Sequence, residues 1–390
     1  MTSYKRLGDY IQPVDERNRA LEDLPLMGLS VTKEFIPSVA NIVGTDLSKY
    51  KVIKKQQFAC SLMQISRDGK IPVAMYESNS AIMSPAYPMF EVKDKDVLLP
   101  EYLMMWFSRA EFDRQAAYYA IGGVRGSLDW KDFLNLELPI PPIEKQREIV
   151  AEYNAVQKKI DLNNQLIQKL EEVAQDIFNS LLEKGFEKNT CRLGDLIKIK
   201  GGFSYNSQGL EMGNSYLLGM GCVSFDNRFV EDGIRLYLDN VPEQHIVKPK
   251  DIIIATRQQS ENLPILGCPA MIPPYLENRK LVIASNLYRV ENKSELSNEI
   301  IYQILRSKNY QEHIKFHTKG TTVGMITKDA IEDYTFETPL FSLLYNFQGS
   351  LNKIADNIFS KRTENQKLIE LKDLLLSKLL IDNRLRIFAL

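Results

Sequence analysis

Several loops of the sequence carry side chains of the types that recognise nucleic acids. Residues 256–260 read Thr-Arg-Gln-Gln-Ser and residues 66–70 read Ser-Arg-Asp-Gly-Lys, and each stretch follows an apolar run. Arginine and glutamine can form paired hydrogen bonds with the edges of guanine and adenine in the major groove. Residues 200–205, Lys-Gly-Gly-Phe-Ser-Tyr, offer donors suited to phosphate oxygens. Each loop taken singly is more often a solvated turn than a binding loop.

Two glycine-containing loops share a second kind of chemistry. Residues 122–126 (Gly-Gly-Val-Arg-Gly) and residues 319–322 (Lys-Gly-Thr-Thr) place a cation beside glycines, whose exposed amides can approach phosphate. Together the loops give one set of candidate DNA-binding residues: Arg67, Lys70, Arg125, Lys200, Ser204, Tyr205, Arg257, Gln258, Gln259, Lys319, Thr321 and Thr322.

Motifs for catalysis are incomplete. Residues 272–275 (Ile-Pro-Pro-Tyr) are similar to the Asn/Asp-Pro-Pro-Tyr motif of amino-group DNA methyltransferases, but isoleucine cannot hydrogen-bond a target amino group. Asp68 with Glu91 and Lys93 is only loosely similar to a nuclease triplet. His313 and His317 have metal-ligand spacing but no zincin glutamate accompanies them. We therefore predict no catalytic residue, no metal and no cofactor in this chain.

The composition is that of an ordinary globular protein. With 390 residues, 44% of them apolar and 25% charged, the chain should hold two domains or more. Its formal net charge of −1 leaves DNA binding to a local concentration of basic side chains. No apolar run approaches the roughly 20 residues that span a bilayer, and the N-terminus has no signal core. The four cysteines form no Cys-x-x-Cys pair and indicate reduced thiols, so we expect a cytoplasmic protein.

Two stretches, residues 146–184 and 343–380, show the apolar spacing of long helices. Apolar residues recur at alternating steps of three and four, the heptad pattern of a coiled coil. The first stretch would form a rod of roughly 58 Å at about 1.5 Å per residue. Its narrow apolar stripe needs a partner, which the second stretch supplies. The predicted seam consists of Ile149, Tyr153, Val156, Ile160, Leu170, Val173, Ile177 and Leu181, and of Phe347, Leu351, Ile354, Ile358, Leu368, Leu371, Leu375 and Leu379.

The centres of the two helices are polar. If the helices pair in antiparallel fashion, residues 163–165 (Asn-Asn-Gln) should meet residues 361–363 (Lys-Arg-Thr) and fix the register. The alternative is that both stretches are solvated faces.

The helices belong to a larger internal repeat. Residues 6–9 (Arg-Leu-Gly-Asp) recur 186 residues later from Arg192, and the helical segment 101–119 recurs 198 residues later as 299–317. The difference between these spacings, 12 residues, is the net length added within the second globular part. Short apolar runs bounded by glycine and proline indicate that each globular part is mostly β, with one or two helices near its end.

These patterns predict an α+β fold. Two similar β-rich domains are separated by two long helices that pack as an antiparallel coiled coil with pseudo-twofold symmetry. The predicted boundaries are 1–142 for the first domain, 143–186 for the first long helix, 187–340 for the second domain and 341–390 for the second long helix.

Over essentially its whole length the chain resembles the specificity subunit of type I restriction-modification systems. The most specific short motif is residues 138–149, Leu-Pro-Ile-Pro-Pro-Ile-Glu-Lys-Gln-Arg-Glu-Ile, at the start of the first helix. The second copy keeps only Pro339 of the two prolines and lacks the glutamine.

The resemblance implies a non-catalytic protein in which each β-rich domain is a target-recognition domain for one half of a bipartite double-stranded DNA site. The paired helices would set the spacer and dock two methyltransferase (M) subunits, which bind S-adenosylmethionine and flip out adenines. Motor-nuclease (R) subunits would complete the complex.

Two other hypotheses remain open on sequence grounds. One is a coiled-coil scaffold whose two domains bind proteins, and the other is a nuclease or methyltransferase in its own right. A salt-dependent affinity for DNA distinguishes the first from a specificity subunit, and turnover by the purified chain tests the second.

Overall fold

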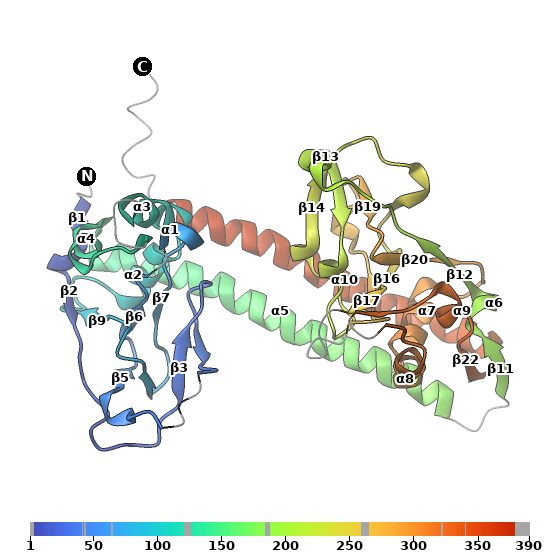
Figure 1. The fold of residues 1–390 in the computed structure, drawn as a ribbon, viewed down its shortest axis with the longest axis horizontal. Helices are drawn as coiled ribbons and strands as arrows, with labels where there is room; N and C mark the ends of the chain where they lie inside the picture. The colour runs from blue at the N-terminus through green and yellow to red at the C-terminus, as the bar shows by residue number, and fades with distance from the viewer. Residues whose placement is uncertain are drawn as a thin grey trace. The chain divides into compact units, whose positions relative to one another are not determined.

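The computed structural model describes residues 4–40, 42, 44–63, 65–120, 126–183, 188–258, 265–320, 323–339 and 341–378. The chain divides into two compact units (Figure 1). Unit 1 comprises the described residues of 1–160 and 368–390, and unit 2 comprises those of 161–367. Among the described helices, none is apolar over a stretch long enough to cross a membrane.

Unit 1 contains two four-stranded sheets and a two-stranded ribbon. The first sheet has the order β2 (Ile11–Pro13), β9 (Met89–Val92), β6 (Phe58–Cys60) and β7 (Val73–Met75). The second has the order β4 (Phe35–Pro37), β3 (Leu26–Leu29), β8 (Ser80–Met83) and β5 (Lys51–Lys54). The ribbon pairs β1 (Tyr4–Arg6) with β10 (Glu137–Pro139), so the chain enters and leaves this domain at neighbouring strands.

The helices of unit 1 follow the strands of its core. They are α1 (Ile65–Asp68), α2 (Pro100–Phe107), α3 (Ala110–Ala120) and α4 (Trp130–Asn135). Phe58, Phe90 and Phe107 are fully buried where α2 and the first sheet meet, with ring centroids 5.1–6.1 Å apart.

Unit 2 repeats this arrangement. One sheet has the order β12 (Ile197–Gly201), β20 (Leu287–Asn292), β16 (Ile252–Ala255) and β18 (Pro269–Met271). The other has the order β14 (Ile234–Tyr237), β13 (Leu210–Leu218), β19 (Leu281–Ile283) and β15 (Ile246–Val247). Two ribbons pair β11 (Lys188–Arg192) with β22 (Thr335–Pro339) and β17 (Arg257–Gln258) with β21 (Gly324–Met325).

The helices of unit 2 likewise correspond to those of unit 1. They are α6 (Leu193–Leu196), α7 (Asn298–Arg306), α8 (Lys308–Phe316) and α9 (Lys328–Glu332). α7, α8 and α9 correspond to α2, α3 and α4, and α6 corresponds to a short 3-10 turn, Leu7–Asp9.

The two globular parts share one topology down to strand direction and register. The central pair of the second sheet is parallel in both units, β3 with β8 and β13 with β19. In the closing ribbons, Arg6 stands opposite Glu137 and Arg192 opposite Thr335. The equivalent residues Arg6 and Arg192 are 186 positions apart, and Glu137 and Thr335 are 198 positions apart. These are the two spacings found in the sequence. The prediction of two similar β-rich domains is confirmed.

The extra length of the second copy is spread over several loops. Residues at equivalent ladder positions are separated by 186 at Ile11 and Ile197 but by 200 at Val92 and Asn292. The spacing has returned to 198 by the closing ribbon. The net difference of 12 residues therefore combines insertions before β20 with a small deletion after it.

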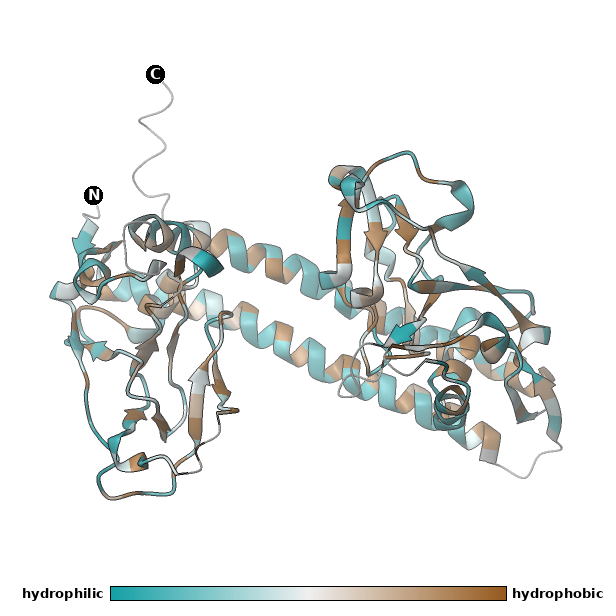
Figure 2. Cartoon of the chain, viewed as in Figure 1, coloured by the Kyte–Doolittle hydropathy of each residue, from teal (hydrophilic) through white to brown (hydrophobic). Residues whose placement is uncertain are grey.

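Two long helices complete the fold, α5 (Ile143–Glu183) and α10 (Phe341–Lys378). In unit 2 they run antiparallel, because Asn163 of α5 contacts Asn365 while Glu171, further along α5, contacts the earlier Arg362. In unit 1 Gln157 of α5 accepts a hydrogen bond of 2.6 Å from Lys372 of α10. Teal and brown alternate along both helices in Figure 2, as expected for amphipathic helices.

Each long helix is also part of the core of a unit. Ile149 packs against the core of unit 1, while Ala174, Phe178 and Leu351 belong to the core of unit 2. Glu171 joins the helices to the globular part of unit 2, since it pairs with Arg362 at 2.7 Å and lies 4.0 Å from Arg228. The long helices therefore hold the β-rich parts through packing as well as through charge.

The predicted seam residues differ in how deeply they are buried. Ile160, Leu181, Leu351 and Ile358 are buried, and the half-buried seam residues are Ile149, Tyr153, Val156, Leu170, Ile177, Ile354, Leu368 and Leu375. Leu379 lies outside the described residues.

For Phe347, Leu371 and Val173 the prediction of a seam position is corrected, because the structure exposes these side chains. Their exposed fractions are 37%, 41% and 47%. A helix of 3.6 residues per turn drifts by about 20° per heptad, so a strict repeat leaves the contact line. Near the end of α5 the buried contact positions are instead Ala174 and Phe178, which are both 1% exposed.

The polar centre of the helix pair differs in part from the prediction. Asn163 is buried, and its Nδ2 donates to Asn365 Oδ1 at 2.8 Å. Asn365 Nδ2 donates in turn to Asn164 Oδ1 at 2.8 Å. Of the predicted run 361–363, Arg362 pairs with Glu171, one turn or more from the asparagines. The partner of the asparagines was misplaced because the heptad alignment set Asn365 against an apolar residue of the first copy.

Candidate nucleic-acid interface

Two of the predicted DNA-binding loops of unit 2 form one structure. Arg257 of β17, two residues after the sheet strand β16, pairs across a short antiparallel ladder with Met325 of β21. Lys319 forms two backbone hydrogen bonds with the same Met325, of 2.9 and 2.8 Å. Residue 320 must be glycine here, since its φ is +102° and a Cβ atom would lie 2.3 Å from the carbonyl oxygen of Val323. The exposed Arg257 and Lys319 therefore flank Met325 on one small β structure.

A hydrogen bond at the base of this structure is repeated in unit 1. In unit 2 the N–H of Ile326 donates to the carbonyl of Thr256 at 3.2 Å. In unit 1 the N–H of Leu128 donates to the carbonyl of Leu62 at 2.9 Å. Leu62 and Thr256 each follow the equivalent sheet strand, β6 or β16, and Leu128 and Ile326 each follow the glycine loop. Both units thus bring together the loop after this strand and the loop after the helix α3 or α8.

The side chains carried by this junction differ between the units. In unit 1 the exposed Arg67 lies on α1 and forms an ion pair of 2.6 Å with the adjacent Asp68, and Lys70 follows in the exposed turn. The turn is tied to α3, because the N–H of Ile71 donates to Asp113 at 3.1 Å. Asp113 also forms a buried ion pair of 2.8 Å with Lys33, which fixes the tip of the β3–β4 hairpin against α3.

Lys328 extends the basic surface of unit 2 and was not found from the sequence. Its Nζ lies 6.0 Å from the ring centroid of Tyr288. The hydroxyl of Tyr288 donates to the carbonyl of Ile326 at 3.1 Å, and burial raises the pKa of Tyr288 while the Arg257 charge opposes that rise. Tyr288 also stands opposite Gly201 in the ladder of β12 and β20. No signal in the sequence links these segments, because they are far apart along the chain.

The residues of the third predicted loop of unit 2, residues 200–205, lie near two different sheets. Lys200 is 40% exposed and forms an ion pair of 3.3 Å with Glu291, on the ladder that reaches Tyr288. Ser204 and Tyr205 instead lead toward the other sheet, where the Tyr205 ring lies 6.0 Å from that of Tyr237. A Cβ atom at residue 202 would lie 2.1 Å from the carbonyl oxygen of Ala284, so this close crossing requires glycine.

Four predicted residues, Arg125, Gln259, Thr321 and Thr322, lie outside the described residues, and of Gln258 the structure describes only the backbone. The candidate interface is therefore built from Arg67 and Lys70 in unit 1, and from Lys200, Arg257, Lys319 and Lys328 in unit 2.

The residues of unit 2 considered as catalytic or metal-binding motifs are buried or bonded within that unit. Ile272 is fully buried, and burial raises the pKa of Tyr275 well above its ordinary value. His313 contacts the carbonyl of Ala330 at 2.8 Å, and its ring stacks on that of His317 at 4.0 Å. Among the described residues, no three His, Cys, Asp or Glu side chains are gathered as a metal site requires.

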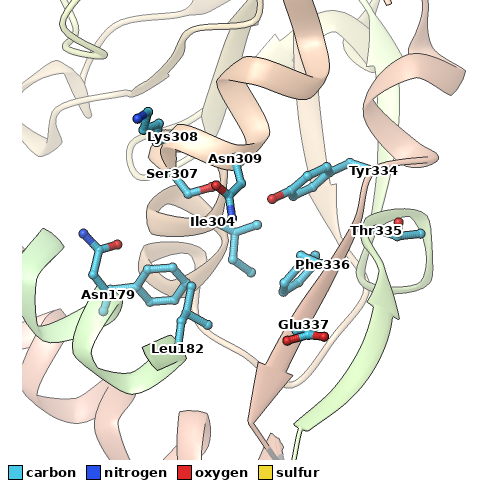
Figure 3. A pocket seen from close by; sticks show the side chains of 11 residues that line it. Asn179, Leu182, Ile304, Ser307, Lys308, Asn309, Tyr334, Thr335, Phe336 and Glu337 are labelled. Carbon is cyan, nitrogen blue, oxygen red and sulfur yellow. The ribbon is translucent and has the colours of Figure 1, made fainter. Parts of the chain in front are cut away.

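A cavity of about 590 Å³ lies within unit 2, where the end of α5 faces α7, α8 and β22 (Figure 3). The rings of Tyr334 and Phe336, stacked at 5.6 Å, form one side of it, and Phe178 forms another. Its lining includes none of the candidate DNA-binding residues. The cavity is therefore separate from the candidate interface.

Comparison with known proteins finds a family model that matches part of the chain. Residues 38–172 match the family model "Type I restriction modification DNA specificity domain". This range covers most of the first β-rich part together with the first three quarters of α5. A crystal structure of a type I restriction-modification S subunit from M. genitalium has the same fold, with a TM-score of 0.57 at 13% identity over 98% of this chain and 96% of that one.

Two curated proteins are similar over most of the chain. The type I restriction enzyme HindI specificity subunit of Haemophilus influenzae is 21% identical over 88% of this chain and 89% of its own length. The putative type I restriction enzyme MjaX specificity subunit of Methanocaldococcus jannaschii is 20% identical over 90% of this chain and 83% of its own. By the family model over residues 38–172 and by these two relatives, the chain is similar to the specificity subunits of type I restriction-modification systems.

Proposed function

We propose that this subunit reads a bipartite DNA site, with each β-rich part contacting one half. The observation that carries the proposal is the repeated junction at Leu62 and Leu128 and at Thr256 and Ile326. The same backbone hydrogen bond joins the two loops in both units, but the side chains that these loops display differ. A duplicated frame with different contact residues is suited to two different short sequences.

The division of labour within the complex follows from the same proposal. The chain supplies specificity, while two methyltransferase (M) subunits and motor-nuclease (R) subunits supply the chemistry. The exposed faces of α5 and α10 are available to such partners, and their length sets the spacer between half-sites. The alternative of a scaffold for proteins is not favoured, because the family model and both curated relatives describe DNA specificity.

Methylation mapping tests the proposal directly. The chain is co-expressed with the methyltransferase subunits of its own system, and methylated adenines are mapped across the host genome. We expect a motif of two short sequences separated by a spacer of fixed length, absent when this chain is omitted. A contiguous motif, or methylation that does not depend on the chain, would contradict the proposal.

Binding measurements give an independent test. A protein that neutralises about six phosphates should lose on the order of 10³-fold in DNA affinity between 50 and 200 mM salt. An affinity for DNA that does not respond to salt would favour the scaffold instead.

A further inference from the structure

Helices α3 and α8 each carry an exposed aromatic side chain in their last turn, four residues before the first glycine of the loop that follows. Tyr118 of α3 is 72% exposed and Phe316 of α8 is 87% exposed. Single apolar side chains at a surface are common and need no function. Here, however, two exposed rings stand at one position of a duplicated fold.

The two helices are equivalent residue by residue. Phe112 and Ala116 of α3 are buried, with 2% and 0% exposure, and they face the core of unit 1. Tyr310 and Ile314, each 198 residues further on, are buried at 0% and 1% in the core of unit 2. The rings of Tyr118 and Phe316 are separated by the same 198 residues, so both point away from their core at the same place in the helix.

Both rings stand beside the residues proposed to hold DNA. In unit 2, Phe316 lies between the exposed Lys315 and His317 on the chain. Lys319 follows three residues after Phe316 and is bonded to Met325, the residue that pairs with Arg257. In unit 1, Tyr118 is in edge contact with Tyr119 at 5.7 Å, on the helix to which the turn after Lys70 is tied. Cationic side chains around an exposed ring favour an occupant that is both anionic and aromatic.

We propose that Tyr118 and Phe316 are wedge residues, each of which inserts its ring at a base step of the half-site read by its unit. This inference rests on the proposed function. Phe316 carries no hydrogen-bonding group, so its ring cannot read a base edge by hydrogen bonding and can contribute only stacking or apolar contact. Insertion of an apolar side chain partly unstacks a base step, and stacking against the ring compensates for the lost base–base contact.

Fluorescence of 2-aminopurine provides the test, because this base brightens when it is unstacked. The probe is a duplex carrying the site selected from random duplexes by the full-length chain in complex with its methyltransferase subunits. Adenines are replaced by 2-aminopurine one position at a time. Besides the adenine that the methyltransferase subunits flip out in each half-site, we expect brightening at one further step in each half-site with the wild-type complex, and this further signal reports the wedge. Phe316→Ala should remove the signal in one half-site only and Tyr118→Ala in the other, and each should weaken binding about tenfold.

Matched variants separate stacking from other effects. Tyr118→Phe and Phe316→Tyr keep a ring and should keep both the signal and the affinity. Phe225→Ala removes a ring that is 60% exposed elsewhere in unit 2 and should change neither. The salt dependence of binding should be the same in all variants, since no cation is removed.

The outcomes distinguish the wedge from the function on which it rests. Specific binding by the wild-type complex with brightening only at the flipped adenines, or alanine variants that keep the further signal and the affinity, would overturn the wedge and leave the specificity function intact. No selected site for the wild-type complex would overturn both. Retained brightening in the half-site of the unmutated unit shows that a variant is folded.

Discussion

The side-chain oxygen of Gln348 accepts a hydrogen bond of 2.9 Å from the backbone N–H of Ser297, the residue that precedes helix α7. Gln146 makes the same bond, also 2.9 Å, to the N–H of Leu99 before α2. Ser297 and Leu99 are equivalent by the 198-residue spacing, but Gln348 and Gln146 are not, since Leu344 occupies the position equivalent to Gln146. The second copy thus keeps the bond and supplies it from one helical turn further along.

The two glutamines should differ in their contribution to stability. Gln146 is fully buried and also donates to the carbonyls of Val97 and Pro141, both at 2.8 Å. Gln146→Leu would remove three hydrogen bonds to partly buried backbone groups and should destabilise unit 1 by about 2–4 kcal/mol. Gln348→Leu removes one bond from a half-buried site and should cost unit 2 about 1 kcal/mol. Hydrogen exchange of the Leu99 and Ser297 amides in the full chain measures both effects, and equal losses of protection would refute the distinction.

The glutamine bonds show which features of the fold can be predicted from the sequence and which cannot. The duplication, the strand-rich globular parts and the two long helices follow from spacing alone, because local periodicity determines them. The glutamine at Gln348 was missed, since a bond can be supplied from another turn when its geometry still reaches the same amide. Likewise Phe347 and Leu371 fit the heptad but not the contact line of the helix, which drifts from a strict repeat.

The asparagine pair at the centre of the long helices should behave as a coupled unit. Asn365→Leu leaves Asn163 buried without its acceptor, which should destabilise the helix pair by about 1–3 kcal/mol. The double variant Asn163→Leu with Asn365→Leu replaces both partners by apolar groups and should recover that loss. Exchange of the α5 and α10 amides around these residues gives the comparison. If the double variant were no more stable than the single one, the pair would not be coupled.

Glu299 should make the stability of unit 2 depend on pH. Its side chain is buried, and burial raises its pKa from 4.5 to about 6. The folded chain therefore holds this proton up to about pH 6, whereas the unfolded chain releases it near pH 4.5. Across that window the free energy of unfolding falls as pH rises, by about 2 kcal/mol in total.

Replacement of Glu299 by glutamine should remove this dependence. The side-chain oxygen of Gln303 is buried without a partner, and the new amide group can donate to it. Glu299→Gln should therefore stabilise unit 2 by about 2 kcal/mol at pH 7 and by much less at pH 4. Urea denaturation followed at both pH values measures the change. The exposed Glu295→Gln variant serves as the control and should have the same pH profile as wild type.

Arg257 should determine specificity in a single half-site. If its guanidinium pairs with a base edge, Arg257→Ala should cost about tenfold to a hundredfold in affinity for duplexes with an intact site. The loss should vanish when the matching half-site is already scrambled. Equilibrium binding to duplexes with one or both half-sites scrambled measures this.

Alanine variants of two lysines provide comparisons for the binding loss of Arg257→Ala. Lys319→Ala should weaken binding to all duplexes alike and reduce the salt slope by about one, as expected for a phosphate contact. Lys308 lies at the other end of α8, is 88% exposed, and should be neutral when replaced by alanine. An equal loss on every duplex with Arg257→Ala would make Arg257 a phosphate contact as well.

The long helices should act as a ruler. Inserting one heptad after Ile160 in α5 and another before Leu368 in α10 lengthens both helices at the boundary of the two units by about 10 Å. We expect the spacer between half-sites to grow by about three base pairs, given a rise of about 3.4 Å per base pair. Methylation mapping reads the spacer directly. An unchanged spacer would exclude the ruler, and a heptad in α5 alone should abolish methylation because the helices then pair out of register.

The junction of the recognition loops could not be predicted from the sequence. Each loop was recognised from its side chains, but the bond between Thr256 and Ile326 joins residues far apart along the chain. Lys328 was missed for the same reason, since only the folded sheet brings Tyr288 and Gly201 to its side. Composition identifies contact chemistry, whereas long-range strand pairing decides which contacts share a surface.

The paired strands β1 with β10 and β11 with β22 bear on how new specificities can arise. Each β-rich part starts and finishes on adjacent strands of a single ribbon, and the long helix continues directly from the last of them. A whole segment from one ribbon strand to the other is therefore a cassette with both cut ends together. Recombination that exchanges such a cassette would give the host a new methylation pattern in one step, while the long helices keep their sequence.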